Sequence, residues 1–232
     1  RDAARVLRAA GYRVVVPSQL CCGSPALSQG DEELAARAAG ANLRFLGLAS
    51  ARFGGGVPVV SPCPSCTLAL RDTLPAFTGS PEAARLAEHV WDLGEFLAGP
   101  AREALMAALD GVGAEAAARS DAPHLPWLYH TPCHLRALGV GRPFPALAPS
   151  TVEDAGPASD GCCGMGGLNG LTRDGHAASL AAGAPVLEAY RTLARENPTV
   201  LSDCPVCRWQ IADATGLPTA HPVQRLAALL GD

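Results

Sequence analysis

The sequence predicts an α/β fold made of two pseudo-symmetric tandem halves, each a small parallel sheet flanked by helices. Strand-like apolar runs alternate with helical patterns along the chain, which is typical of parallel sheets. The cysteines also fall into two similarly spaced sets, related by a constant offset of 141 residues. The 232 residues are enough for two compact units, which we place at residues 1–118 and 119–232.

The repeat is carried by the nine cysteines. Residues 21–23, Cys-Cys-Gly, are followed after 39 residues by Cys-Pro-Ser-Cys at residues 63–66. The same arrangement recurs at residues 162–164 and 204–207, again with 39 residues between, and only Cys133 lies outside it. Clustered, duplicated thiols indicate two soft-metal sites. The candidate ligands are Cys21, Cys22, Cys63 and Cys66 in the first half and Cys133, Cys162, Cys163, Cys204 and Cys207 in the second.

In the first half, each strand-like run leads towards a cysteine group. Residues 12–17, Tyr-Arg-Val-Val-Val-Pro, are typical of a buried strand that runs into the first Cys-Cys-Gly. Asp31 is a good N-cap, and acidic residues follow it in the first turn. The expected strands are residues 12–17 and 57–60, and the expected helices are residues 1–10, 31–50, 67–74 and 82–97, the last around a short segment at residues 90–91.

Residues 98–126 are rich in Ala, Gly and Pro and are expected to connect the halves, with one amphipathic piece at residues 102–109. Ligands collect beyond the carboxyl ends of strands in parallel sheets, and the cysteine groups fall at those ends. The second half is expected to form strands at residues 127–130, 151–154 and 199–202 and helices at residues 177–196, 207–215 and 223–230.

The residues around the thiols suit an inorganic sulfur centre. In Cys-Pro-x-Cys the proline falls early in a helix, where its missing N–H costs little. The helix N-terminus then directs N–H groups and a positive dipole at the thiolates. The glycine after each Cys-Cys pair lets the backbone turn sharply beside a bulky core. Adjacent cysteines cannot both reach one small ion without strain, but they can reach two iron atoms of a cluster.

Three interpretations of the cysteines stay open. Zinc takes four ligands, whereas the second half offers five thiols, which favours an iron–sulfur cluster. The first half has four thiols, and the repeat predicts a fifth upstream of Arg1. Structural disulfides are favoured least, because the cysteine count is odd and two pairs are adjacent. We therefore expect one or two iron–sulfur clusters, with zinc as the second choice.

Composition excludes several classes of function. The formal net charge is −4 and no block of basic residues occurs, so we expect no binding to nucleic acid. No apolar run approaches the roughly 18 to 20 residues of a membrane span, so any membrane attachment is expected through a partner. The cysteine usage indicates a reducing compartment. The chain begins with Arg rather than Met, which suggests a piece of a larger protein.

The tandem pattern of Cys, Cys-Cys-Gly and Cys-x-x-Cys resembles the cysteine-rich CCG domain family over essentially the whole chain. Its members include the cluster-bearing subunit of heterodisulfide reductase, the iron–sulfur subunits of glycolate and lactate oxidation, and an iron–sulfur subunit of anaerobic glycerol-3-phosphate dehydrogenase. The second half is most similar to the last of these, although its 28-residue gap between Cys133 and Cys162 is slightly short for the family. The likeness is carried by residues 130–137, 162–165, 203–211 and 220–223.

The resemblance implies an electron-transfer subunit of a flavin-linked dehydrogenase that oxidises glycerol 3-phosphate or a 2-hydroxy acid and passes electrons towards quinone or another acceptor. The heterodisulfide reductase relatives imply an alternative, a thiol–disulfide reductase acting at a noncubane 4Fe–4S cluster. The family also implies two partners, a flavin-dependent dehydrogenase subunit and a ferredoxin-like iron–sulfur domain upstream or on another chain. The implied location is the cytoplasm or the inner face of the cell membrane.

Other polar and aromatic residues have a structural interpretation beside a functional one. His134, next to Cys133, is either a residue that tunes a cluster by hydrogen-bonding to sulfur or a packing histidine. Arg136 and Arg208 either offset thiolate charge or are solvated. The residues that we interpret first as structural are His130 and His221 in turns, Trp91, Trp127 and Trp209 in the core, and Asp92, Glu95 and Asp203, which form no acid–base pair.

Overall fold

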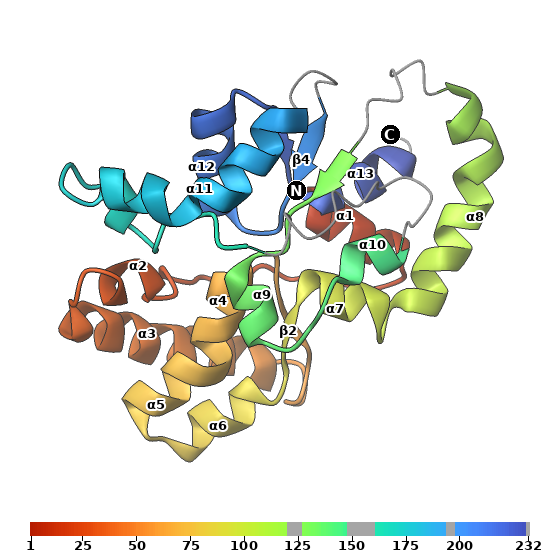
Figure 1. The fold of residues 1–232 in the computed structure, drawn as a ribbon. Coiled ribbons are helices and arrows are strands. Elements are labelled where there is room, and N and C mark those ends of the chain that lie inside the picture. Colours follow the sequence, from red (N-terminus) through yellow and green to blue (C-terminus); the bar gives the residue numbers. More distant parts are fainter. Residues whose placement is uncertain (120–126, 148–160, 194–197, 231–232) are drawn as a thin grey trace.

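The computed structural model describes residues 1–119, 127–147, 161–193 and 198–230, with the backbone alone for residues 111–119. It is a mixed α/β structure with two small parallel sheets (Figure 1). In the first half β1 (Val59–Ser61) pairs with β2 (Val90–Asp92). In the second half the strand order is β3 (Trp127–Tyr129), β4 (Thr199–Leu201) and β5 (Thr219–Ala220). The predicted fold class is therefore confirmed.

Helices of the first half surround its sheet and lead into the connector. The Asp31 side chain accepts the Leu34 N–H at 2.9 Å, as expected for an N-cap. The helices are α1 (Asp2–Ala9), α2 (Ser24–Leu27), α3 (Glu32–Ala51), α4 (Pro64–Leu68), the π-helical turn η1 (Ala69–Thr73), α5 (Leu74–Thr78), α6 (Pro81–Ala87), α7 (Leu93–Ala98) and α8 (Arg102–Arg119).

The three helices expected in the second half begin within two residues of their predicted starts, whereas the shorter helices α9, α10 and η3 were not predicted. The long helix α11 packs on α12, and α12 follows directly from β4. The helices are α9 (Cys133–Ala137), α10 (Pro143–Leu147), the 3₁₀ turn η3 (Asn169–Leu171), α11 (His176–Leu193), α12 (Pro205–Thr215) and α13 (Pro222–Leu229).

The expected strand over residues 12–17 is wrong. The segment is extended but unpaired, and Val15 and Val16 are 50% and 76% exposed. Among the described residues β1 pairs with β2 alone, so this apolar run has no neighbouring strand to bury it. It lines a surface groove together with Phe45 and Leu48 of α3. In the second half, by contrast, β4 has a strand on each side.

Two strands, β2 and β5, were not predicted from the sequence. The connector also contains a longer helix than expected. β2 occupies the segment interpreted as an interruption of a helix, and β5 has only two residues, too few for an alternating pattern. The amphipathic piece at residues 102–109 continues as α8 to Arg119. The strand expected at residues 151–154 lies outside the described residues.

The largest hydrophobic cluster joins the two halves. It combines Val6 of α1 and Phe96 of α7 with Tyr129 of β3 and Leu226 of α13. Figure 1 shows α1, from the start of the chain, beside α13 near its end, and these helices contact each other. In the same way α9 packs on α4, and α10 packs on α7. The boundary between residues 118 and 119 stays a prediction.

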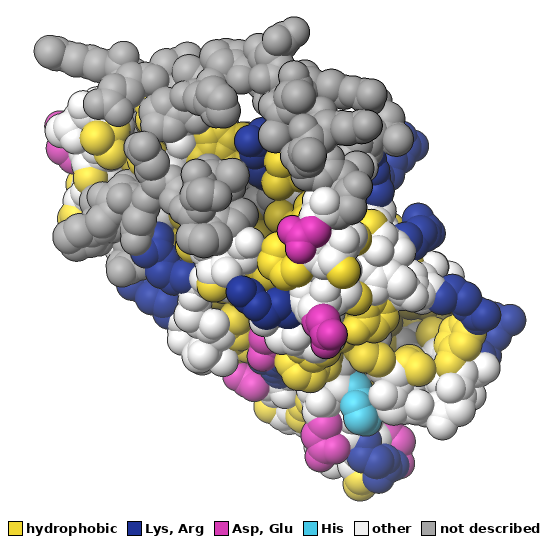
Figure 2. All heavy atoms as spheres, turned by 90° about the vertical axis from the view of Figure 1, so that its right-hand side faces the viewer, with side chains coloured by type: hydrophobic (Ala, Val, Ile, Leu, Met, Phe, Trp, Pro, Cys, Tyr) yellow, Lys and Arg dark blue, Asp and Glu magenta, His cyan; other side chains and the backbone are white. Residues whose placement is uncertain are grey.

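On the face that includes α8, the described residues carry charges of both signs. Figure 2 shows arginine side chains and acidic side chains mixed with apolar ones over the described part of this face. This mixture agrees with the formal net charge of −4. None of the helices in the described ranges combines the length and the hydrophobicity that a membrane span needs.

Candidate metal centre

The buried thiols of the second half lie beside one another where β4 ends. Cys204 is the N-cap of α12, Pro205 is its first residue, and Cys207 lies in its first turn. The Sγ atoms of Cys163 and Cys207 are 3.1 Å apart and share a hydrogen bond. A hydrogen bond from Cys207 also lowers the pKa of Cys204, while the pKa of Cys207 itself is raised well above its usual range. The three thiols therefore interact closely enough to titrate as one group.

The remaining two thiols of the second half, Cys133 and Cys162, lie near this group. Cys133 opens α9, directly after β3, and burial followed by the charges of Cys162, Cys163 and Cys204 raises its pKa to about 11. Cys162 is exposed, and its Sγ accepts the Gly164 N–H at 3.3 Å. The structure thus brings together all five thiols that the sequence singles out in this half. Their role as ligands stays a prediction.

The first half repeats the arrangement at β1 and α4. Cys63 is the N-cap of α4 and Cys66 lies in its first turn. The hydrogen bond from Cys66 lowers the pKa of Cys22 to about 5 and that of Cys63 to about 7, and it raises the pKa of Cys66 itself. Cys21 is exposed and hydrogen-bonds to Cys22. In each half the last cysteine of Cys-Pro-x-Cys therefore hydrogen-bonds with the second cysteine of the Cys-Cys pair.

Different contacts hold the Cys-Cys-Gly loop in each half. In the second half Gly164 has a φ of +89°, and an added Cβ would lie 2.0 Å from the Ser179 carbonyl oxygen and 2.5 Å from the Gly183 nitrogen. The loop therefore packs directly on the backbone of α11. In the first half Asn42 of α3 holds the loop instead, because its side-chain N–H donates to the Cys21 carbonyl at 3.0 Å.

His134 lies between the two thiol groups. Its ring nitrogen Nδ1 is 2.7 Å from the Ser65 hydroxyl in the first half, although its own helix belongs to the second. Burial lowers the pKa of His134, and the charges of Cys22 and Cys163 oppose that shift. His134, which the sequence analysis proposes as a tuning residue for one site, therefore interacts with the charges of both thiol groups.

Further contacts bring the two Cys-Cys-Gly loops and the two Cys-Pro-x-Cys turns together. The Leu168 N–H donates to the Ser28 hydroxyl at 3.0 Å, across 140 residues of sequence. The charge of Cys63 raises the pKa of Cys204 against the dominant hydrogen bond from Cys207. The two candidate sites are thus neighbours inside one molecule rather than separate pockets on opposite faces.

Two arginines and one tryptophan near the thiols can be compared with the roles expected from the sequence. Arg136 is exposed, whereas Arg208 is half-buried and donates to the Ser202 carbonyl at 2.6 Å. Burial lowers the pKa of Arg208, and nearby thiolates and Asp203 oppose this. Trp209 is 60% exposed, so its interpretation as a core residue is wrong. It lies on the outer face of α12, beside a shallow pocket bordered by Met165.

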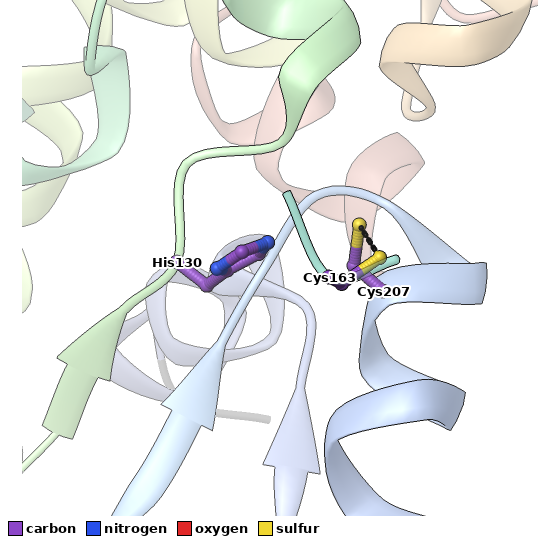
Figure 3. A group of neighbouring side chains, drawn as sticks. All are labelled: His130, Cys163 and Cys207. Carbon is purple, nitrogen blue, oxygen red and sulfur yellow. Dashed lines mark hydrogen bonds between the residues drawn. The ribbon is translucent and has the colours of Figure 1, made fainter. Parts of the chain in front are cut away.

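Sequence reasoning missed His130. The residue is completely buried, and one ring nitrogen lies within 4.8 Å of the sulfur atoms of Cys163 and Cys207, which are themselves within that distance of each other. Figure 3 shows the imidazole at the carboxyl end of β3, on the same side as the two thiols. The signal that could have found it is its position directly after a strand and three residues before Cys133.

This donor set fits a thiolate-bound iron–sulfur group. Five thiols lie near one another in the second half, three of them buried, and in each half a Cys-Pro-x-Cys pair lies at the start of a helix. Buried thiolates need a cation or hydrogen-bond donors to offset their charge. A single zinc ion would use four of these five sulfurs.

Comparison with known proteins finds one family and two kinds of relative. A family model described as a cysteine-rich domain, CCG, matches residues 1–71 and 127–212. The chain is 27% identical over 238 residues to a subunit of anaerobic glycerol-3-phosphate dehydrogenase from Escherichia coli strain K12, covering 99% of this chain and 54% of that protein. It is 28% identical over 219 residues to a subunit of fumarate reductase (CoM/CoB) from Methanothermobacter marburgensis, covering 90% of this chain and 37% of that protein. The chain thus spans about half the length of the first relative. No solved structure matches.

Proposed function

The chain belongs to the CCG cysteine-rich domain family, and from this premise we propose that it is an iron–sulfur electron-transfer module of a multi-subunit oxidoreductase. The observation that carries the proposal is the close approach of the Cys163 and Cys207 sulfurs, 3.1 Å apart, beside Cys204 at the start of α12 and near Cys133 at the start of α9. The two relatives support it, since both are named as subunits of redox enzymes.

In this proposal the second pocket holds one iron–sulfur cluster and the first pocket holds another. When bound, such a cluster supplies a one-electron carrier. The chain's part is to keep its thiols deprotonated, to direct helix N-termini at them and to bury the sulfurs from water. The proposed ligands are Cys133, Cys162, Cys163, Cys204 and Cys207 for one cluster and Cys21, Cys22, Cys63 and Cys66 for the other, with a further ligand from outside this chain.

The proposed partner is a flavin-dependent dehydrogenase subunit acting on glycerol 3-phosphate or a 2-hydroxy acid. The glycerol-3-phosphate dehydrogenase relative supports a partner of this class, because its name makes it one subunit of such an enzyme. Electrons would then leave towards quinone or another acceptor, with a ferredoxin-like domain between. The proposed location is the cytoplasm, at the inner face of the membrane through the partner.

The alternative is a thiol–disulfide reductase like the cluster-bearing subunit of heterodisulfide reductase, acting at a noncubane 4Fe–4S cluster. The second relative favours it, since its name includes the thiols CoM and CoB. The exposed position of Cys162 also leaves one edge of the second pocket open to a substrate. Reduction of a small heterodisulfide by the reconstituted, reduced protein would establish this activity, and its absence would favour electron transfer alone.

The proposal is tested by anaerobic purification and reconstitution, followed by measurement of iron, acid-labile sulfide and zinc. Iron with matching sulfide supports it, whereas stoichiometric zinc without sulfide would contradict it. Two matched variants then separate the sites, because Cys163 and Cys22 occupy equivalent positions in the repeat. We expect Cys163→Ser to remove the iron and the absorption of the second site and Cys22→Ser to remove those of the first. Unchanged iron and spectra in both variants would remove the ligand assignment.

A further inference from the structure

The His130 side chain is held in a fixed position beside the proposed thiol ligands. Five thiols already supply those ligands, so the histidine is not needed as a further one. Its backbone N–H donates to the Leu201 carbonyl at 2.8 Å and so extends the pairing of β3 with β4 by one residue. The side chain is completely buried, and its ring meets the ring of Tyr190 edge-on at 6.1 Å between centroids. Backbone pairing and ring packing together leave the imidazole little freedom to turn away from the sulfur atoms.

Neither ring nitrogen of His130 has a hydrogen-bond partner among the described residues. A buried polar group without a partner costs about 1 to 3 kcal/mol, and such groups are rare in native proteins. Figure 3 shows the ring at the carboxyl end of β3, on the same side as Cys163 and Cys207, and a ring nitrogen lies within 4.8 Å of both sulfurs. The unpartnered ring nitrogens are therefore close to the sulfur atoms of two proposed ligands.

We propose that His130 donates a hydrogen bond from a ring N–H to the Cys163 sulfur when the second pocket holds its iron–sulfur group. The inference rests on the proposed function. Cys163 is the candidate acceptor because its sulfur is buried and lies within 4.8 Å of a ring nitrogen of His130. A neutral imidazole carries the one N–H that the contact needs.

The contact has a consequence for electron transfer. Reduction adds negative charge to a cluster and its ligands, and an N–H donor to sulfur stabilises that charge. The hydrogen bond therefore raises the reduction potential of the second site. His130 is in this sense a positioning residue, which acts on the bound group through the Cys163 sulfur rather than by direct ligation. Five thiols already supply the ligands.

Three variants of the reconstituted protein test the proposal. His130→Leu fills the space but has no donor, whereas His130→Gln keeps an N–H donor. His89→Leu is the control, because His89 lies beside Gly56, away from the thiols. We expect iron and sulfide to stay at the wild-type level in all three. The potential of the second site, followed by electron paramagnetic resonance, should become more negative in His130→Leu, recover in part in His130→Gln and stay unchanged in His89→Leu.

The outcomes separate this inference from the proposed function. Absence of iron and sulfide from the wild type would overturn the proposed function. Normal iron in His130→Leu with an unchanged potential would overturn the inference alone. Nitrogen hyperfine coupling of ¹⁵N-histidine-labelled wild type and His130→Gln provides the second measurement: weak coupling that His130→Gln loses supports the hydrogen bond, and strong coupling from a directly bound nitrogen contradicts it. This measurement decides the question even if His130→Leu fails to fold.

Discussion

At the scale of single residues, both ring nitrogens of His221 are hydrogen-bonded, and one of them links the two halves. Nδ1 accepts the Val223 N–H at 3.0 Å and so caps α13. Nδ1 is the acceptor, so Nε2 carries the proton and donates to the Pro62 carbonyl at 2.9 Å. Burial, with a smaller contribution from the Arg208 charge, lowers the pKa of His221 to about 4. The fold therefore favours the neutral form of His221, with its proton on Nε2, at the contact between the two halves.

This arrangement predicts a loss of stability in mild acid. In the unfolded chain His221 protonates near pH 6.5, but in the fold it protonates only near pH 4, so its contribution is complete above pH 6.5 and is lost as the pH falls towards 4. Between pH 7 and pH 5 the wild type should lose about 2 kcal/mol more than His221→Asn, which can cap but does not titrate. Urea unfolding at both pH values measures this. Parallel pH dependence in the two proteins would exclude His221 as the cause.

The comparison with His221→Asn is needed because two buried carboxyl groups act in the opposite direction. Burial, with the charge of Asp203, raises the pKa of Asp92 to about 7, and burial raises that of Asp203 to about 6. Their protonation stabilises the fold as the pH falls, since both pKa values exceed those of the unfolded chain. Both groups are present in wild type and variant, so the difference isolates the histidine.

The thiols could be predicted from sequence, but His130 and His221 could not. Cysteines that recur at fixed spacing carry their own signal, because spacing is a property of the chain. The role of a histidine depends on which groups surround its ring after folding. His130 follows a strand and precedes a helix, which is equally typical of a turn residue. Only its complete burial without a hydrogen-bond partner distinguishes it.

At the scale of elements, the offset of 141 residues supplies matched pairs for experiment. Val59 of β1 and Val200 of β4 are equivalent, but Val59 is half-buried and Val200 is completely buried. β4 lies between two strands, and β1 has one neighbour among the described residues. We expect Val200→Ala to lower the free energy of unfolding by about 2 kcal/mol and Val59→Ala by less than about 1. Equal losses in chemical denaturation would show that the first sheet is buried as deeply as the second.

The glycines of the two Cys-Cys-Gly loops form another matched pair. Gly23 and Gly164 both have a φ near +90°, where an alanine is strained by about 1 to 2 kcal/mol. A Cβ at position 164 would also overlap the backbone of α11, whereas at position 23 its nearest neighbour is the Ala35 Cα at 3.3 Å. Gly164→Ala should therefore destabilise the protein by about 2 kcal/mol more than Gly23→Ala. Equal destabilisation in thermal unfolding would contradict this close packing.

Helices were predicted better than strands for a physical reason. A long helix such as α3 or α11 offers several turns of periodic pattern and a cap, whereas each strand here has at most three residues. The run at residues 12–17 has the composition of a strand, but a strand also needs an edge to pair with. Val15 and Val16 have none among the described residues, so they remain on the surface.

At the scale of the whole molecule, the repeat seen in sequence does not imply two separate cores. Helix α1 belongs to the first half by sequence, yet it packs on α13 and α8. The Val6 side chain is completely buried in a cluster with Leu226 and Tyr129. A residue offset can reveal duplication, but it does not show which faces of the two copies meet. That information lies in the packing alone, and it bears on how the protein unfolds.

The shared core predicts that the metal-free protein unfolds as one cooperative unit. Removing the Leu226 side chain beyond Cβ leaves a cavity between α13 and α1, so Leu226→Ala should lower the free energy of unfolding by about 2 to 4 kcal/mol. Because both halves border this cluster, they should lose structure at the same lowered temperature. The control is Leu74→Ala, since Leu74 is equally buried but packs in a small cluster of the first half. Scanning calorimetry should give one transition in all three proteins, with calorimetric and van't Hoff enthalpies equal. Two resolved transitions, of which Leu226→Ala shifts only one, would mean that the halves are energetically independent despite their contact.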